Sequence, residues 1–159
     1  MALDRSKNSR AYENMVEHLF LGELLRHMWY ERDQTVEVSK AQVDSEGYDV
    51  VLAAGTTTRY VQLKTSTPAK VNERLALREG GCVVATLLDP DASRVRYRMW
   101  DATKRAMDQL PQAKSNVYKR GTEQRQYRAG HRKVPTGRFS EPMDIAELCA
   151  ALFPRTKGG

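Results

Sequence analysis

The segment from Cys82 to Leu88 constrains the fold most, because Thr86 alone interrupts its run of apolar residues. Two glycines precede the run and Asp89-Pro90-Asp91 follows it, which gives it the length of a strand rather than of a helix. A strand that is apolar on both sides must be covered on both sides. Residues 82–88 are therefore predicted to form a central strand within a layered protein.

Residues 9–29 predict a helix, because they contain no proline and their apolar side chains recur with a period near 3.6. Glu13 and Glu17 share one stripe with Phe20, so two carboxylates are expected on the face that packs inward. Glu23 is expected to pair with His27, one turn further along.

Residues 49–64 predict a β-hairpin next to this helix in the chain. The first strand runs from Asp49 to Ala53, the turn is Ala54-Gly55-Thr56, and the second strand runs from Thr57 to Lys64. Side chains alternate along a strand, so Gln62 and Lys64 point to the same face. A further short strand is predicted over residues 35–38 because of its β-branched residues.

The second half of the chain is less regular. Residues 94–100 alternate in the manner of an edge or half-exposed strand, and residues 141–153 predict a closing helix. Residues 101–137 are polar and basic with weak periodicity, and we expect them to be irregular. The length suits one domain over residues 1–159. The expected class is α/β (α+β), with a mixed central sheet of four or more strands flanked by helices.

The charge of the chain favours a polyanionic partner. The 26 basic and 20 acidic residues give a formal charge of +6, and most of the excess lies between Lys104 and Arg138. Tyr118 and Tyr127 interleave with these cations, a composition that can bind a nucleic acid backbone and stack on bases. The residues expected to contact nucleic acid are Lys114, Lys119, Arg120, Arg125, Arg128, His131, Arg132 and Lys133.

Several other classes of protein are disfavoured. Cys82 and Cys149 lack the spacing of a zinc site or of a disulfide framework, and no apolar run approaches the roughly 20 residues that span a bilayer. Motifs of the GxxxxGK[ST] and GxGxxG types are also missing. We expect a cytoplasmic protein without membrane contact.

Glu17, Asp49, Gln62 and Lys64 are the candidate catalytic residues. Carboxylate and amide oxygens bind Mg²⁺ or Mn²⁺, so the two acids with Gln62 could form a metal site. Lys64 could position the attacking water or stabilise the charge that develops on a phosphate. These residue types in this order suit phosphodiester hydrolysis.

The same residues resemble the signature of the PD-(D/E)XK nuclease-like superfamily. That signature places a glutamate on a helix, an aspartate at the start of a hairpin strand, and Glu-x-Lys or Gln-x-Lys on the adjacent strand. The form Gly47-Tyr-Asp49 followed by Gln62-Leu-Lys64 is similar to Mrr-type restriction endonucleases and to small bacterial proteins. The resemblance implies a restriction endonuclease-like core, Mg²⁺ or Mn²⁺ as cofactor, DNA rather than RNA as substrate, and it allows a homodimer.

A second function stays open. Gln62 stands where many active members have a carboxylate, which removes one negative charge from the metal site. The alternative to a metal-dependent nuclease is therefore a nuclease-like domain that binds nucleic acid or another protein without cutting.

Overall fold

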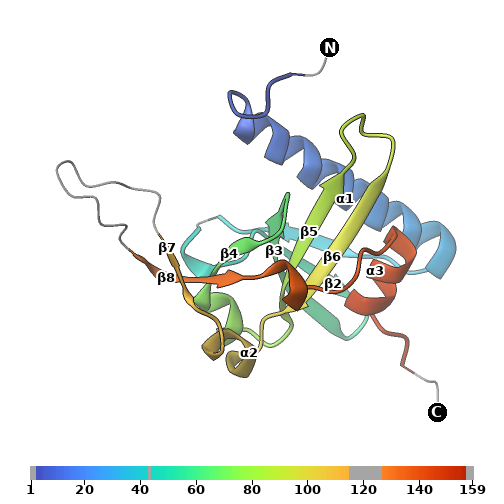
Figure 1. Cartoon of the computed structure of the whole chain (residues 1–159). Coiled ribbons are helices and arrows are strands. Elements are labelled where there is room, and N and C mark those ends of the chain that lie inside the picture. The colour runs from blue at the N-terminus through green and yellow to red at the C-terminus, as the bar shows by residue number, and fades with distance from the viewer. Residues whose placement is uncertain (1–2, 43, 115–126, 157–159) are drawn as a thin grey trace.

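The structure is a computed structural model that describes residues 3–42, 44–114 and 127–156. In this part, the chain forms three α-helices and two β-sheets (Figure 1). The elements are α1 Ser9–Arg32, β1 Glu37–Lys40, β2 Val50–Ala54, β3 Thr57–Lys64, β4 Ala69–Asn72, β5 Gly81–Leu88, β6 Val95–Asp101, α2 Lys104–Asp108, β7 Gln112–Lys114, β8 Tyr127–Val134 and α3 Ile145–Leu152. Short 3₁₀ turns lie at Asp44–Glu46, Glu73–Leu77 and Thr136–Arg138. The class is α+β.

The larger sheet is mixed and has the strand order β1-β2-β3-β5-β6. β2 and β3 form the predicted antiparallel hairpin, and β5 runs parallel to β3 with Lys64 opposite Ala85. β5 lies between two neighbours, and residues 81–86 are buried, which confirms the prediction of a central strand. β1 begins two residues later than the strand predicted over residues 35–38, because Glu37 is the first residue to pair with β2, opposite Ala53.

α1 and α3 pack on one face of the larger sheet (Figure 1). The side chains of Phe20, Leu24 and Met28 are fully buried against it, as the helical stripe predicts. The expected pairing of Glu23 with His27 is wrong, because the Glu23 carboxylate accepts a hydrogen bond from the hydroxyl of Tyr97 on β6. Tyr97 is buried, so its hydroxyl needs a hydrogen-bond partner, whereas His27 is only partly buried and can be solvated.

A second, three-stranded sheet with the order β4-β8-β7 lies over the opposite face. The expectation that residues 101–137 are irregular is therefore wrong for most of the described part, which contains α2, β7 and β8. β8 is stabilised by pairing with β4, in which Ala69 lies opposite Val134. Local periodicity cannot show that two segments about 60 residues apart pair with each other. The sequence led us to expect helices on both faces of the larger sheet, and on this face the second sheet lies instead.

The closing helix is shorter than residues 141–153. The side chain of Asp144 caps the first turn by accepting a hydrogen bond from the backbone N–H of Glu147. The side chain of Glu147 in turn accepts from the backbone N–H of Asp144. This capping box fixes the start of α3 at Ile145. Met143, just before it, forms backbone hydrogen bonds with Tyr97 and so extends the edge of the larger sheet. Within the described residues, no helix is long and apolar enough to cross a bilayer.

Candidate active site

The four candidate catalytic residues line one cavity of about 290 Å³. Glu17 comes from α1, Asp49 directly precedes β2, and Gln62 and Lys64 lie at the end of β3. The antiparallel pairing of β2 with β3 brings the start of one strand to the end of the other, and Val50 lies opposite Val61. The hairpin alone therefore places Asp49 beside Gln62 and Lys64, and α1 adds Glu17.

Backbone hydrogen bonds hold two of these side chains in place. Asp49 Oδ2 accepts from the N–H of Leu63 at 2.6 Å. Gln62 Oε1 accepts from the N–H of Asn72, at the end of β4, at 3.3 Å. The Gln62 oxygen keeps a further lone pair, because an amide oxygen can accept two hydrogen bonds. The second sheet therefore helps to orient a residue of the site.

Glu17 is paired with a cation. The Nζ atom of Lys40 lies 2.5 Å from Glu17 Oε1, and the glutamate side chain is 22% exposed. The same oxygen is buried, and its contact with Lys40 lacks the angles of a hydrogen bond, so it has no hydrogen-bond partner in the described part of the chain. The two charges still attract strongly, because their attraction depends on distance and only weakly on angle. A buried carboxylate oxygen here is thus placed to accept a cation.

The cavity lies at the end of the larger sheet, and side chains from both faces of that sheet line it. Val61 and Leu63 belong to the core under α1, and the alternation of β3 turns Gln62 and Lys64 toward the second sheet. Glu17 reaches the cavity from the α1 side. The cavity therefore forms where β3 ends and no longer separates the two faces.

Four other polar residues line the cavity, namely Glu13, Asn14, Thr65 and Thr86. Glu13 shares the helical stripe of Glu17 and was the reserve candidate for its role, whereas the other three were not selected from the sequence. Thr86 is the one buried polar side chain of the described core, at 1% exposure. The signal for it was present, since Thr86 is the only polar residue in the apolar run of residues 82–88.

The donor set permits a hard divalent cation with few protein ligands. The described residues contain no group of three or more histidine, cysteine, aspartate or glutamate side chains placed to hold a metal ion. Glu17, Asp49 and the amide oxygen of Gln62 would supply two charged donors and one neutral donor. Mg²⁺ commonly binds through one or two carboxylates and keeps several waters, so this set and the buried Glu17 oxygen fit it.

Known proteins do not identify the chain. No protein-family model, curated protein or solved structure matches it. A functional assignment must therefore rest on the chemistry and geometry of its own residues.

The expected nucleic-acid contacts that the structure describes all belong to the second sheet. Lys119, Arg120 and Arg125 lie outside the described residues. Lys114 belongs to β7, whereas Arg128, His131, Arg132 and Lys133 belong to β8. The guanidinium of Arg132 binds the Glu73 carboxylate and the Leu110 carbonyl, so this arginine supports the fold. Lys133 is exposed, and His131 lies opposite Asn72, the residue that binds Gln62.

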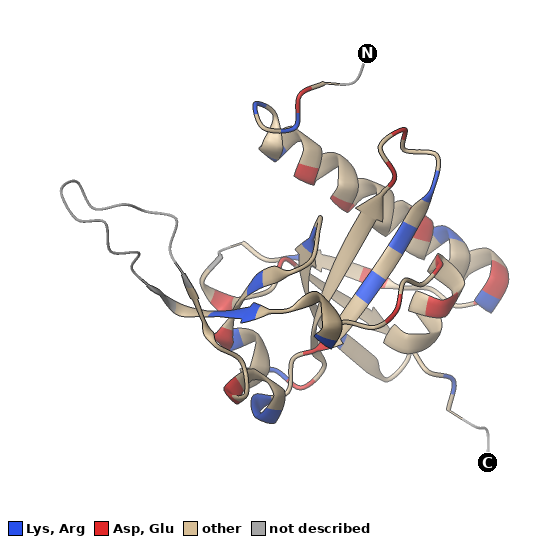
Figure 2. Cartoon of the chain, viewed as in Figure 1, with Lys and Arg blue, Asp and Glu red and all other residues tan. Residues whose placement is uncertain are grey.

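β6 carries a row of basic side chains that were not among the nucleic-acid contacts expected from the sequence. Arg98 lies in register with Ala85, which lies in register with Lys64, so the two cations share one face of the sheet. Arg96 lies on the same face, one step toward the site end of the strand. Figure 2 shows basic residues along β6 and on the strands of the second sheet. The alternation of residues 94–100 predicted the strand, but only the register places its arginines in line with Lys64.

Proposed function

We propose that this chain is a metal-dependent nuclease that hydrolyses phosphodiester bonds, with DNA as the favoured substrate, on a restriction endonuclease-like core of the PD-(D/E)XK type. The observation that carries the proposal is the common cavity of Glu17, Asp49, Gln62 and Lys64, which come from three separate segments. The order of a helix, an antiparallel hairpin and a strand parallel to its second arm supports it.

Glu17, Asp49 and Gln62 would hold the cation, Mg²⁺ or Mn²⁺. When bound, the cation lowers the pKa of coordinated water and neutralises charge on the phosphate. The hydrogen bond from Leu63 fixes the Asp49 carboxylate, so its second oxygen keeps a constant direction. The amide of Gln62 contributes no charge, and we therefore expect weaker metal binding than a third carboxylate would give.

Lys64 supplies the positive charge that the reaction needs. It lies two residues after Gln62 on the same face of β3, so its ammonium group reaches the cavity beside the metal-binding residues. An ammonium group in this place orients an attacking water through a hydrogen bond and stabilises the extra negative charge of the transition state.

The substrate backbone would lie across the face shared by Lys64, Arg96 and Arg98. Arg98 continues this face across the sheet from Lys64, Arg96 continues it past the end of β3, and exposed Lys133 adds a charge from the second sheet. Each phosphate that such a cation neutralises releases condensed counterions, so binding should weaken steeply with salt.

The decisive experiment is cleavage of plasmid and single-stranded DNA with Mg²⁺ or Mn²⁺, followed on a gel. We expect nicking that a chelator abolishes and that Lys64→Ala reduces at least 100-fold, the scale of a lost electrostatic or acid–base contribution. Lys104→Ala is the matched control, because this lysine is exposed on α2 and does not line the cavity. Cleavage that persists in Lys64→Ala would remove the assigned role.

A second function is favoured by one contact. Gln62 Oε1 already accepts from the Asn72 N–H, so the amide also serves to join β3 to β4. A structural role for Gln62 suits a nuclease-like module that binds nucleic acid without cutting. Intact DNA with both metals, together with salt-sensitive binding that Arg96→Ala weakens, would favour this alternative.

A further inference from the structure

α1 carries a second, outward stripe opposite its buried one. Its members are spaced alternately by four and three residues and are all exposed: Ala11, Met15, His18, Gly22, Leu25 and Trp29. This spacing is the seam of a coiled coil, which follows one side of a helix for its whole length. Trp29 is 61% exposed, its neighbour Tyr30 is 76% exposed, and Met15 is 49% exposed. A helix on the surface of a monomer would normally carry polar residues here.

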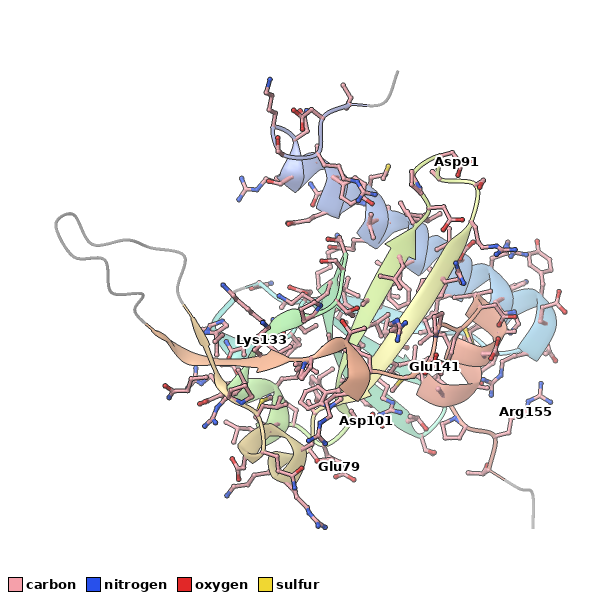
Figure 3. The ribbon with its side chains drawn as sticks, viewed as in Figure 1. Glu79, Asp91, Asp101, Lys133, Glu141 and Arg155 are labelled. Atoms are coloured by element: carbon pink, nitrogen blue, oxygen red, sulfur yellow. The ribbon has the colours of Figure 1, made fainter. Side chains whose placement is uncertain are left out.

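An apolar groove of about 440 Å³ lies at the other end of the same stripe. Ala11, Tyr12 and Met15 of α1 line one side, and Leu88 at the end of β5 lines the other with Pro90 and Ala92 of the β5–β6 loop. Figure 3 labels Asp91 in this loop. Each chain therefore presents a pair of large aromatic side chains at one end of α1 and an apolar groove at the opposite end.

We propose that the outward stripe of α1 is an interface on which two copies of this chain pair with their α1 helices antiparallel. Antiparallel pairing places the aromatic end of each helix beside the groove of the other, so both contacts form at once through a twofold axis. The proposal does not depend on the proposed function, because it involves the face of α1 that points away from the cavity.

The sizes of the side chains select the antiparallel direction. In the register that pairs stripe positions in layers, Trp29 lies opposite Ala11, Leu25 lies opposite Met15, and Gly22 lies opposite His18. Trp29 and His18 thus each face a small residue, and Leu25 and Met15 face each other as residues of similar size. Parallel pairing would place Trp29 against Trp29 and leave a void between two copies of Gly22. A side chain at Gly22 would meet nothing within 4 Å inside its own chain, so this position is open to a partner.

Charge favours the same direction. Two carboxylates, Asp4 and Asp89, line the groove, and hydrogen bonds from Ser6 hold the pKa of Asp4 below its usual value. The one guanidinium there, Arg5, lies over the ring of Tyr12. Asp89 lies 3.9 Å from Arg96, whereas Asp4 forms no ion pair within the described residues. Arg26, exposed one turn before Trp29, would approach the partner's Asp4.

The available area suits a weak dimer. With roughly 150–250 Å² for each large aromatic side chain, the exposed parts of the stripe and of Tyr30 amount to on the order of 500 Å² per chain. Two chains would bury about 1,000 Å², which is near the lower limit for a specific interface. Self-association should therefore depend on concentration in the micromolar range and above.

Sedimentation and light scattering of the full chain over a concentration series test this. We expect the mean mass to rise toward that of two chains, and Trp29→Glu to weaken association at least tenfold while circular dichroism stays unchanged. The control is Leu77→Glu, which places the same charge at an even more exposed apolar residue away from α1. A chain that stays monomeric throughout, or an equal effect of both variants, would overturn the proposal.

Cross-linking tests the direction. Met15→Cys and Leu25→Cys are prepared separately, and the native Cys82 and Cys149 are buried and do not interfere. We expect a disulfide-linked dimer from the mixture of the two variants and little from either alone. If each variant cross-links efficiently with itself and the mixture gives no dimer of one variant with the other, the pairing is parallel and the antiparallel interface is overturned.

Discussion

Asp49 Oδ2 accepts a 2.6 Å hydrogen bond from the backbone N–H of Leu63, the residue that lies between Gln62 and Lys64. One carboxylate therefore lines the cavity and also ties the start of β2 to the end of β3. Its charge and its hydrogen bond can be removed separately, because asparagine keeps an acceptor oxygen.

We expect Asp49→Asn to lose metal-dependent cleavage with a change in stability below about 1 kcal/mol, since the Leu63 N–H keeps a partner. Asp49→Ala should lose activity and also about 1–3 kcal/mol, because a partly buried donor is left unsatisfied. Urea unfolding measures both stabilities, and exposed Asp108→Asn on α2 is the control. Equal stability of the two Asp49 variants would contradict the structural role of this hydrogen bond.

Under the proposed function, Lys40 would compete with a metal ion for Glu17. Its ammonium group lies 2.5 Å from Glu17 Oε1, and the lysine side chain is 57% exposed. Lys40→Met should lower the Mg²⁺ concentration that gives half-maximal cleavage by several-fold, because the carboxylate no longer has a cation to displace. Its effect on stability should be about 1 kcal/mol or less, because the lysine of this half-buried ion pair is itself more than half exposed.

A metal titration of activity measures this shift, and calorimetric titration with Mn²⁺ gives a reading that does not require turnover. Lys104→Met on α2 is the matched control for the loss of one positive charge. An unchanged or higher metal requirement in Lys40→Met would show that Glu17 does not bind the metal.

Glu23 accepts a hydrogen bond from the hydroxyl of buried Tyr97, which joins α1 to the edge strand β6. We expect Glu23→Ala to cost about 1–3 kcal/mol, because the phenol is left without a partner, and Tyr97→Phe to cost about 1 kcal/mol. The double variant should be more stable than the sum of both losses predicts. Chemical unfolding of the four proteins measures the coupling.

Cleavage should persist in Glu23→Ala at temperatures where the variant is folded, because this residue does not line the cavity. Loss of activity without loss of structure would place Glu23 in the catalytic site instead. Additive effects in the double-variant cycle would contradict the hydrogen bond.

Because both cysteines are buried, we expect the free energy of unfolding to fall at alkaline pH. Burial raises the pKa of Cys82 from 9.0 to about 12 and that of Cys149 to about 11, although nearby arginines oppose this. The folded state keeps these protons after the unfolded state has lost them. Stability is therefore fully retained below about pH 9 and falls as the pH rises above it, by ~1.4 kcal/mol per pH unit for each thiol until its folded pKa is reached.

Thermal unfolding between pH 8 and pH 11 measures this slope. A Cys82→Ala, Cys149→Ala variant should show a shallower decline over the same range, although buried Tyr97, whose pKa burial also raises, leaves part of it. Both thiols should resist a thiol reagent in the native protein and react after unfolding. Rapid reaction of the native thiols would contradict their burial.

Much of the site was accessible from sequence because its parts lie on regular elements. The alternation of β3 co-directs Gln62 and Lys64, and the hairpin brings Asp49 beside them. Glu17 was identified because it shares a helical stripe with Phe20, which is fully buried. Thr86 was not assigned to the site from the sequence, since a single polar residue in an apolar strand has many explanations.

Local sterics and the spacing of apolar residues determined α1, the β2–β3 hairpin and the central position of β5, because periods of 3.6 and 2 residues are properties of short segments. The tertiary structure decided the second sheet, since β4 and β8 pair only when distant parts of the chain meet. It also decided which partners complete the site. Lys40 reaches Glu17, Asn72 reaches Gln62, and Arg98 shares a face with Lys64 only because the strands take this order and register.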